Sequence, residues 1–354
     1  MAAVDFLPDE IVLNILARLP TKPLIRSRSV SRYWRRMLMN PYFMKLRSRK
    51  TIILHINRET LDFIDGNVST NDDSTYSAFK RCYPLEHLHT MRAYARLIGS
   101  FNGLVLIVYI KDLILYNPFT GESKKLPDPP TPIMYRNGYG FGYGDTPSDL
   151  KLVKFIEFSH RFEVYDFKRN SWSSWSSDKY GIRYIMFRHS VGTFLNGYLY
   201  WIKSQHGLIV CSVKDMVLSE INLPSTTSKT TFGNLGTING CLCWLKVTNS
   251  SIFKLWVMKE PSSIESSSWV NTHSFTLDHK WDFYHPLNIF DDGKILIVSV
   301  FKKLIVYDIS KGSYETLNIA LTSERFPIQQ MNCIQYVETL VSPSDVCISR
   351  LDGR

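Results

Sequence analysis

Long hydrophobic runs are absent from this sequence of 354 residues. No apolar stretch reaches the roughly 18 residues that a membrane-spanning helix needs, and the N-terminus, MAAVDFLPDE, lacks the apolar core of a secretory signal. We therefore expect no membrane association and a location in the cytoplasm, the nucleus or both. The glycosylation sequons at Asn67 and Asn249 should then remain unmodified.

Cysteine is scarce and poorly spaced for metal binding. The six cysteines are Cys82, Cys211, Cys241, Cys243, Cys333 and Cys347. Cys241 and Cys243 would share one face of a strand, but no second pair completes a ligand set. His87 and His89 would also share a strand face, again without a third ligand nearby in sequence. We expect free thiols that pack as small hydrophobic side chains, no metal site and no cofactor.

Signatures of catalysis are missing as well. Neither G-x-S-x-G nor H-E-x-x-H occurs. The segment NGYGFGYGD (137–145) alternates glycine, yet it lacks the Lys-Ser/Thr of a phosphate-binding loop, and no helical pattern follows it. Glycine at every second position instead suits a strand or turn that a neighbouring backbone approaches closely. The sequence therefore predicts a protein that is not an enzyme.

Positive charge is concentrated at the start of the chain. Residues 1–50 hold 11 Lys or Arg against 3 Asp or Glu, whereas the other 304 residues hold 31 against 29. The net charge of +10 therefore belongs mainly to the N-terminal segment. A basic segment of this kind could approach nucleic acid or an acidic protein.

Apolar residues recur at helical spacing in residues 7–38. Ile11, Ile15 and Leu19 form one row and Val12 and Leu16 its neighbour, which predicts a helix with one wide apolar stripe.

Prolines divide this segment into three helices. Pro8 suits the first position of a helix and Pro20 ends it, while Pro23 opens a second helical piece. A third should run from about Val30 through Trp34 to Leu38. Three short helices cannot bury so much apolar surface by themselves. Some of it must meet either the rest of the chain or another protein.

The N-terminal segment resembles the F-box, a module that docks on a Skp-type adaptor of cullin ubiquitin ligases. The resemblance lies in two Leu-Pro pairs around an amphipathic helix, followed by Leu, Val-Ser and Trp at fixed spacing. It implies an adaptor-binding surface made of Leu7, Pro8, Ile11, Ile15, Leu19, Pro20, Leu24, Val30 and Trp34. One departure is the arginine run from Arg26 to Arg36, which is denser than the motif requires.

The rest of the chain repeats a strand–turn–strand pattern. The pattern occurs at residues 60–68, 113–127, 162–175, 208–224, 253–270 and 304–319. Alignment places Ile64, Tyr116, Tyr165, Cys211, Trp256 and Tyr307 at equivalent positions, with 45 to 52 residues between successive members. A second pattern, a turn with glycine at its tip that leads into an alternating strand, occurs at 101–109, 194–202, 238–246 and 291–299.

Six units of this length predict a β-propeller, with six blades favoured and seven possible. The alternative is an open array of sheets or a stack of sandwiches. In a ring, the run CIQYVETLV (333–341) would complete the blade that begins at residue 51. We expect one short helix near residues 85–98, and we expect the serine-rich pieces SWSSWSS (171–177) and SSIESSS (262–268) to form turns.

The body resembles the F-box-associated propeller domains of plant F-box proteins. The resembling pieces are FNGL (101–104), YNP (116–118), KLP (125–127), GFGY (140–143), FLNG (194–197), WVMK (256–259) and YVETLV (336–341). The double glycine of kelch repeats is missing from every unit. The chain therefore divides into an F-box module (1–45), a kelch-like propeller (51–342) and a C-terminal tail (343–354), a mainly β protein with a small helical module.

Together the two resemblances imply a non-catalytic substrate receptor. It would bind a Skp-type adaptor, and through it a cullin scaffold, and would present an unidentified target protein for ubiquitination, without nucleic acid or membrane partners. A nucleic-acid-binding regulator that uses the basic helices is the main alternative, and a propeller enzyme is the third. The substrate-binding residues cannot be assigned, although the aromatic segment LDHKWDFYHP (277–286), with His279, Trp281, Tyr284 and His285, could form a binding surface.

Overall fold

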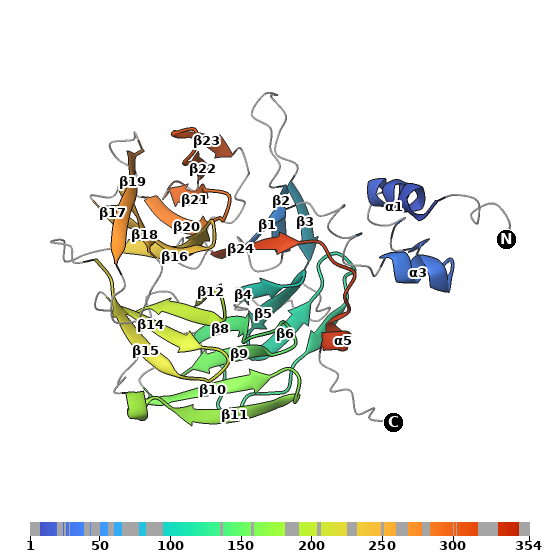
Figure 1. Ribbon diagram of the computed structural model, residues 1–354, viewed down its shortest axis with the longest axis horizontal. Coiled ribbons are helices and arrows are strands. Elements are labelled where there is room, and N and C mark those ends of the chain that lie inside the picture. The colour runs from blue at the N-terminus through green and yellow to red at the C-terminus, as the bar shows by residue number, and fades with distance from the viewer. Residues whose placement is uncertain are drawn as a thin grey trace.

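The chain is described here as a computed structural model. The structure describes residues 8–19, 24, 26–27, 29–38, 43, 50–55, 60–65, 78–82, 95–134, 137–156, 159–180, 191–203, 207–224, 232–248, 251–259, 268–277, 284–299, 301, 303–317 and 332–346. Within these ranges the protein is mainly β, with a small helical region at its N-terminus (Figure 1). The histidines at 87 and 89, the serine-rich piece SSIESSS up to Ser267 and most of the tail lie outside the described residues.

The helices are short. Those with described bounds are α1 (Asp9–Arg18), α3 (Arg32–Leu38), α5 (Pro343–Val346) and the 3-10 helix η1 (Asp178–Tyr180). The second helical piece expected after Pro23 falls largely outside the described residues.

The strands of the described residues fall into six sheets of four. In chain order the strands are β1 (Lys50–His55), β2 (Thr60–Asp65), β3 (Ala78–Cys82); β4 (Ala95–Phe101), β5 (Leu104–Tyr109), β6 (Asp112–Tyr116), β7 (Ser123–Lys125); β8 (Gly138–Tyr143), β9 (Leu150–Phe155), β10 (Arg161–Asp166), β11 (Ser171–Ser176); β12 (Thr193–Leu195), β13 (Tyr198–Ile202), β14 (Gly207–Ser212), β15 (Leu218–Asn222); β16 (Phe232–Ile238), β17 (Cys241–Thr248), β18 (Ile252–Met258), β19 (Trp269–Thr276); and β20 (Tyr284–Ile289), β21 (Lys294–Ser299), β22 (Leu304–Asp308), β23 (Ser313–Leu317), β24 (Asn332–Val337).

The six sheets follow one another around a common centre (Figure 1). Each is antiparallel, and five of them use four consecutive strands. First strands of neighbouring sheets contact each other, and β20 contacts β24, so the cycle closes.

The two ends of the ring meet in one sheet, whose strand order is β24-β1-β2-β3. Strand β24 pairs with β1 from Lys50↔Val337 to His55↔Asn332. This confirms that the C-terminal run completes the sheet begun near residue 51. Because strands from both ends of the chain share this sheet, the row of sheets closes into a ring and has no open end.

The repeat deduced from sequence has a structural counterpart. The aligned residues Ile64, Tyr116, Tyr165, Cys211, Trp256 and Tyr307 all lie on the third strand of their respective sheets. The glycine-tipped pattern also corresponds to one place, the turn between the first and second strands. There Asn102-Gly103 has φ values of 47° and 73°, and Asn196-Gly197 has 48° and 82°. Two successive residues with positive φ make the hairpin turn whose twist matches that of the strands.

Ile110 is an exception to this turn chemistry. It has a φ of 52° and is 45% exposed, although a β-branched side chain is strained in this backbone region. Among the described residues, the other non-glycine positions with positive φ are Asn102, Asn170, Asn196 and Asn239, which tolerate it, and the buried Met216.

We expect Ile110→Asn to raise the free energy of unfolding by about 1 kcal/mol, because asparagine relieves the strain and the Ile110 side chain is 45% exposed, so that little packing is lost. Urea denaturation measures the change. Val217→Asn is the matched control, because Val217 is 46% exposed and has no positive φ. Equal effects of the two substitutions would show that backbone strain at Ile110 is not the cause.

Close packing between sheets explains the alternating glycines. NGYGFGYGD lies largely in β8, where a Cβ added at Gly140 would overlap Trp201 and one at Gly142 would overlap Phe194. Both aromatic residues belong to the next sheet around the ring. The prediction of a structural role is thus confirmed for these two glycines, although the approaching group is an aromatic side chain and not a backbone.

Two local predictions were wrong. SWSSWSS was expected to be a turn, but Ser171–Ser176 is the outermost strand β11 of its sheet. Trp172 and Trp175 pair with Tyr165 and Phe162 of β10, and these ring contacts hold a strand that is otherwise polar. The helix expected near residues 85–98 is also wrong where it can be judged, because residues 95–98 belong to β4.

Candidate functional site

The candidate site is the N-terminal helical module, whose described part is residues 8–43 with gaps. Helix α1 begins after Pro8, whose φ of −55° already suits a helix, and it carries Asp9 and Glu10 in its first turn. Negative charge there complements the helix dipole. The helix ends at Arg18, where the backbone N–H of Leu19 donates to the carbonyl of Leu16. The expected first helix is therefore present, with Pro8 one position before its start.

Helix α3 begins after a serine cap. The hydroxyl oxygen of Ser31 accepts a 3.1 Å hydrogen bond from the backbone N–H of Trp34, which satisfies one of the free donors at a helix start. The hydroxyl of Tyr33 donates to the carboxylate of Asp9. This contact joins the first turns of α1 and α3.

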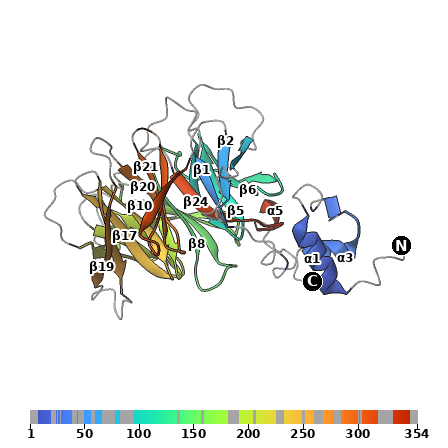
Figure 2. The same ribbon diagram turned by 90° about the horizontal axis from the view of Figure 1, so that it is seen from above.

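The interior of the module includes two residues of the ring. Its buried cluster is Val12, Leu16, Leu24, Met37, Leu38, Phe43, Phe119 and Leu340, with Leu13, Ala17, Leu19 and Trp34 partly buried against it. Phe119 follows β6 and Leu340 follows β24. The helices thus lie against one side of the ring, next to β6 and α5 (Figure 2). Part of the apolar surface of the helices is therefore covered by the chain itself.

The outer surface of the module retains an apolar patch. We define the outer patch as Ile11, Ile15, Val30 and Tyr33, which are 45%, 51%, 65% and 45% exposed. Ile11 and Ile15 are one helical turn apart on α1, so they form a continuous ridge. The predicted wide stripe of α1 is therefore divided: Val12 and Leu16 face inward, whereas Ile11 and Ile15 face solvent.

The nine residues expected to bind an adaptor differ in how far their side chains are exposed to solvent. Pro8, Ile11, Ile15 and Val30 are exposed, Leu19 and Trp34 are partly buried, and Leu24 is completely buried. Leu7 and Pro20 lie outside the described residues. In this conformation Leu24 offers no surface to a partner and supports the patch from within.

Tyr33 belongs to the outer patch but was missed in the sequence. The F-box pattern specifies the neighbouring Trp34 and not Tyr33. Because arginines flank both residues, Tyr33 does not belong to a recognisable apolar run in the sequence. Helical spacing gave no signal, since Tyr33 and Trp34 lie one turn before Met37 and Leu38, which are both buried. Spacing alone would therefore turn Tyr33 inward together with Trp34, whereas Tyr33 is 45% exposed.

Charge on α3 is entirely basic. Arg32, Arg35 and Arg36 are exposed, and the helix holds no acidic residue. The outer patch is therefore bordered by positive charge on α3 and by the acids Asp9 and Glu10 on α1.

The described residues give no indication of metal or thiol chemistry. They contain no group of three or more histidine, cysteine or acidic side chains placed to hold a metal ion. Cys211, Cys243 and Cys333 are buried free thiols, as predicted, and burial raises the pKa of each to about 12. They remain protonated at neutral pH and are poor nucleophiles. No helix in the described part of the chain is long and apolar enough to cross a membrane.

The aromatic segment at residues 277–286 is only partly described. Tyr284 is buried in a core cluster that includes Phe253 of the preceding sheet, with ring centroids 6.3 Å apart. This residue packs onto a neighbouring sheet and does not form an exposed surface. His285 is half-buried, and burial lowers its pKa. His279 and Trp281 lie outside the described residues.

Two protein-family models match the chain. The model described as "F-box domain" matches residues 5–46, and the model described as "F-box associated beta propeller domain" matches residues 52–343.

Curated relatives extend over nearly the whole chain. A protein named F-box protein CPR1, from Arabidopsis thaliana, is 25% identical over 356 residues, covering 88% of this chain and 84% of the relative. An F-box/kelch-repeat protein of the same plant is 26% identical over 374 residues and covers 96% of both chains.

Proposed function

The chain belongs to the family of proteins that carry an F-box associated beta propeller domain, and on this premise we propose that it is a substrate-receptor subunit of a Skp–cullin–F-box ubiquitin ligase. Residues 1–45 bind a Skp-type adaptor, which connects them to a cullin. Residues 51–342 are a propeller in which each of the six four-stranded sheets is one blade. The remaining residues, 343–354, are a tail.

The observation that carries this proposal is the outer patch. Four large apolar side chains are exposed on one small helical module, with Val30 at 65% and with Ile11 and Ile15 adjacent on α1, while other apolar side chains of the module pack against Phe119 and Leu340 of the ring. A folded protein rarely exposes such a cluster without a partner. The adaptor would bind Pro8, Ile11, Ile15 and Val30 directly, with Leu7, Leu19, Pro20 and Trp34 at the edge and Leu24 as internal support.

The position of the module suggests where the target binds. The module contacts the ring at Phe119 and Leu340. The β4–β5 turn lies at this same end of the ring, because a Cβ at Gly103 would meet Val337 and Thr339. The β6–β7 turn lies there too, because Asn117 donates to the carbonyl oxygens of Thr339 and Val341. The opposite end is away from the helices, and there Ile110 and Phe301 are 45% and 66% exposed. We propose that the target binds at this opposite end.

The receptor performs no covalent step. Its contribution is to raise the effective concentration of target lysines near a charged conjugating enzyme. This mechanism needs two binding surfaces held at a suitable distance and no catalytic residue.

The direct test is binding of the purified full chain to a recombinant Skp-type adaptor by titration calorimetry. We expect a stable one-to-one complex that buries about 800 Å² on each partner. Absence of binding by a chain that unfolds cooperatively would refute the adaptor-binding role.

The second candidate is a nucleic-acid-binding regulator, which the exposed Arg32, Arg35 and Arg36 favour. Binding through arginine contacts to phosphates weakens steeply as salt is raised, because bound counterions are released. Submicromolar binding to duplex DNA or RNA with such a salt dependence, together with no binding to the adaptor, would select this function.

A further inference from the structure

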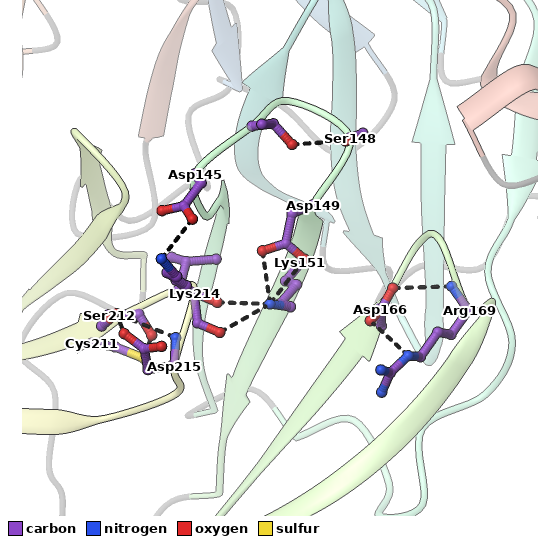
Figure 3. Close-up of polar contacts among 12 residues, drawn as sticks. Asp145, Ser148, Asp149, Lys151, Asp166, Arg169, Cys211, Ser212, Lys214 and Asp215 are labelled. Carbon is purple, nitrogen blue, oxygen red and sulfur yellow. Dashed lines mark hydrogen bonds and ion pairs between the residues drawn. The ribbon is translucent and has the colours of Figure 1, made fainter.

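Four of the turns between the third and fourth strands of a sheet share one construction. The residue that follows the aligned position accepts backbone N–H groups through its side chain: Asn117 Oδ1 from Phe119 and Thr120, Asp166 from Arg169, Ser212 from Asp215, and Asp308 from Ser310 and Lys311. Four residues later φ is positive in every case, at Gly121, Asn170, Met216 and Gly312. Figure 3 shows two of these turns, at Asp166 and at Ser212. The four turns are therefore comparable position by position.

Asn117 does more than its counterparts. Its amide nitrogen donates to the carbonyl oxygens of Thr339 and Val341, at 3.1 and 2.7 Å, and the residue has no exposed surface. An ionised aspartate, as at Asp166 and Asp308, cannot donate, and a serine hydroxyl can donate only once. Only asparagine or glutamine carries both an acceptor for the turn and two donors for the segment after β24.

The tip of this turn also differs in character. The third residue after the aligned position is Phe119 in one sheet, whereas the comparable turns carry the exposed Lys168, Lys214 and Ser310. Phe119 is only 3% exposed, because it inserts into the buried cluster of the helical module together with Leu340. The helical module therefore explains why this turn carries a large apolar side chain, Phe119, where the comparable turns carry polar residues.

We propose that Asn117, Phe119 and Leu340 form a docking socket that fixes the helical module to the ring. Asn117 ties the turn to residues 339–341, and this tie places Phe119 and Leu340 side by side for insertion between α1 and α3. The three residues are positioning residues, since they hold one partner-binding surface relative to the other. The docking itself stands on these contacts alone, and its consequence for ubiquitin transfer rests on the proposed function.

The test uses the full chain with two substitutions in the socket. Phe119→Ser introduces the residue of a comparable turn, and Asn117→Asp keeps the acceptor for the turn while it sets a carboxylate against two carbonyl oxygens. We expect trypsin to cleave after Lys45, Arg47 or Arg49, between the module and β1, about tenfold faster in both variants, because the helices leave the ring more often. Small-angle X-ray scattering should show a larger maximum dimension.

Asp308→Asn is the matched control, because it makes the converse change in a turn that contributes no residue to the buried cluster of the helical module, and it should behave as wild type in both measurements. Thermal unfolding of the ring and titration with a Skp-type adaptor complete the comparison. For Phe119→Ser the melting temperature should stay within a few degrees of wild type, and the adaptor affinity within about threefold.

Unchanged cleavage and scattering in Phe119→Ser would overturn the proposal. So would loss of adaptor binding at unchanged shape, which would assign Phe119 to the fold of the module alone. If wild type fails to bind the adaptor while cleavage still responds, the proposed function fails and the socket stands.

Discussion

Glu163→Gln should lower the free energy of unfolding by about 3–5 kcal/mol, because it leaves a buried lysine without its charge partner. Lys154 and Glu163 face each other across β9 and β10, with 3.0 Å between Nζ and Oε2 and side chains that are 0% and 1% exposed. Lys154 also donates to the carbonyl and the hydroxyl of Thr131, at 2.5 and 2.8 Å, so the pair ties two strands to the segment that leads into their sheet. Urea denaturation would measure the loss.

The pH dependence gives this prediction a second readout. Burial lowers the pKa of Lys154 below its ordinary value, and Glu163 opposes that shift. Without Glu163 the folded-state pKa falls further, so the unfolded chain binds the proton more tightly than the folded chain. Stability of Glu163→Gln should therefore rise as the pH increases from the folded-state pKa of Lys154 towards about 10.4.

An apolar replacement of the whole pair separates the cost of an unpaired charge from the value of the pair. Lys154→Met combined with Glu163→Leu should be as stable as wild type or more stable, because neither buried charge remains. A loss of less than about 1 kcal/mol in Glu163→Gln would contradict the account, since it would mean that water reaches the ammonium group.

The ring was predictable because its signals are local and repeated. The aligned positions recur on the third strand of each sheet, and Asn-Gly turns mark the first hairpins, since two residues with positive φ restrict the choice of side chain. The pairing of β1 with β24 followed from the requirement that a ring of sheets has no open end. The strand β11 was missed because its serines resemble a turn, and its two tryptophans contact rings on β10 that spacing alone does not reveal.

The candidate site was predictable only in part. Helical periodicity identified both apolar rows of α1 but could not decide which row faces inward, because that depends on where α3 and the ring lie. The structure buries Val12 and Leu16 and exposes Ile11 and Ile15. The socket was not predictable, since Asn117 bonds to carbonyl groups more than 220 residues away in sequence, at positions 339 and 341.

The largest expected effect on binding is at the outer patch. Ile11→Glu with Ile15→Glu should weaken adaptor binding at least about 100-fold, because the interface would bury two carboxylates in place of two apolar side chains. Both residues are about half exposed on α1, so the substitutions remove little internal packing. Val217→Glu is the control, because Val217 is similarly exposed, at 46%, on a turn of the ring.

Thermal unfolding and circular dichroism test whether the wild type, the double variant at Ile11 and Ile15, and Val217→Glu share the same folded state. If they do, a difference in affinity reports on the binding surface alone. Selective loss of binding in the helix variant then locates the adaptor on the solvent-facing row of α1. Undiminished binding would instead show that the exposed row is not the adaptor surface. The adaptor would then have to reach the inward row, and the cluster of Val12, Leu16, Phe119 and Leu340 would have to open as it binds. Adaptor binding and ring contact would be mutually exclusive in that case, and binding would tighten when Phe119 is replaced by serine.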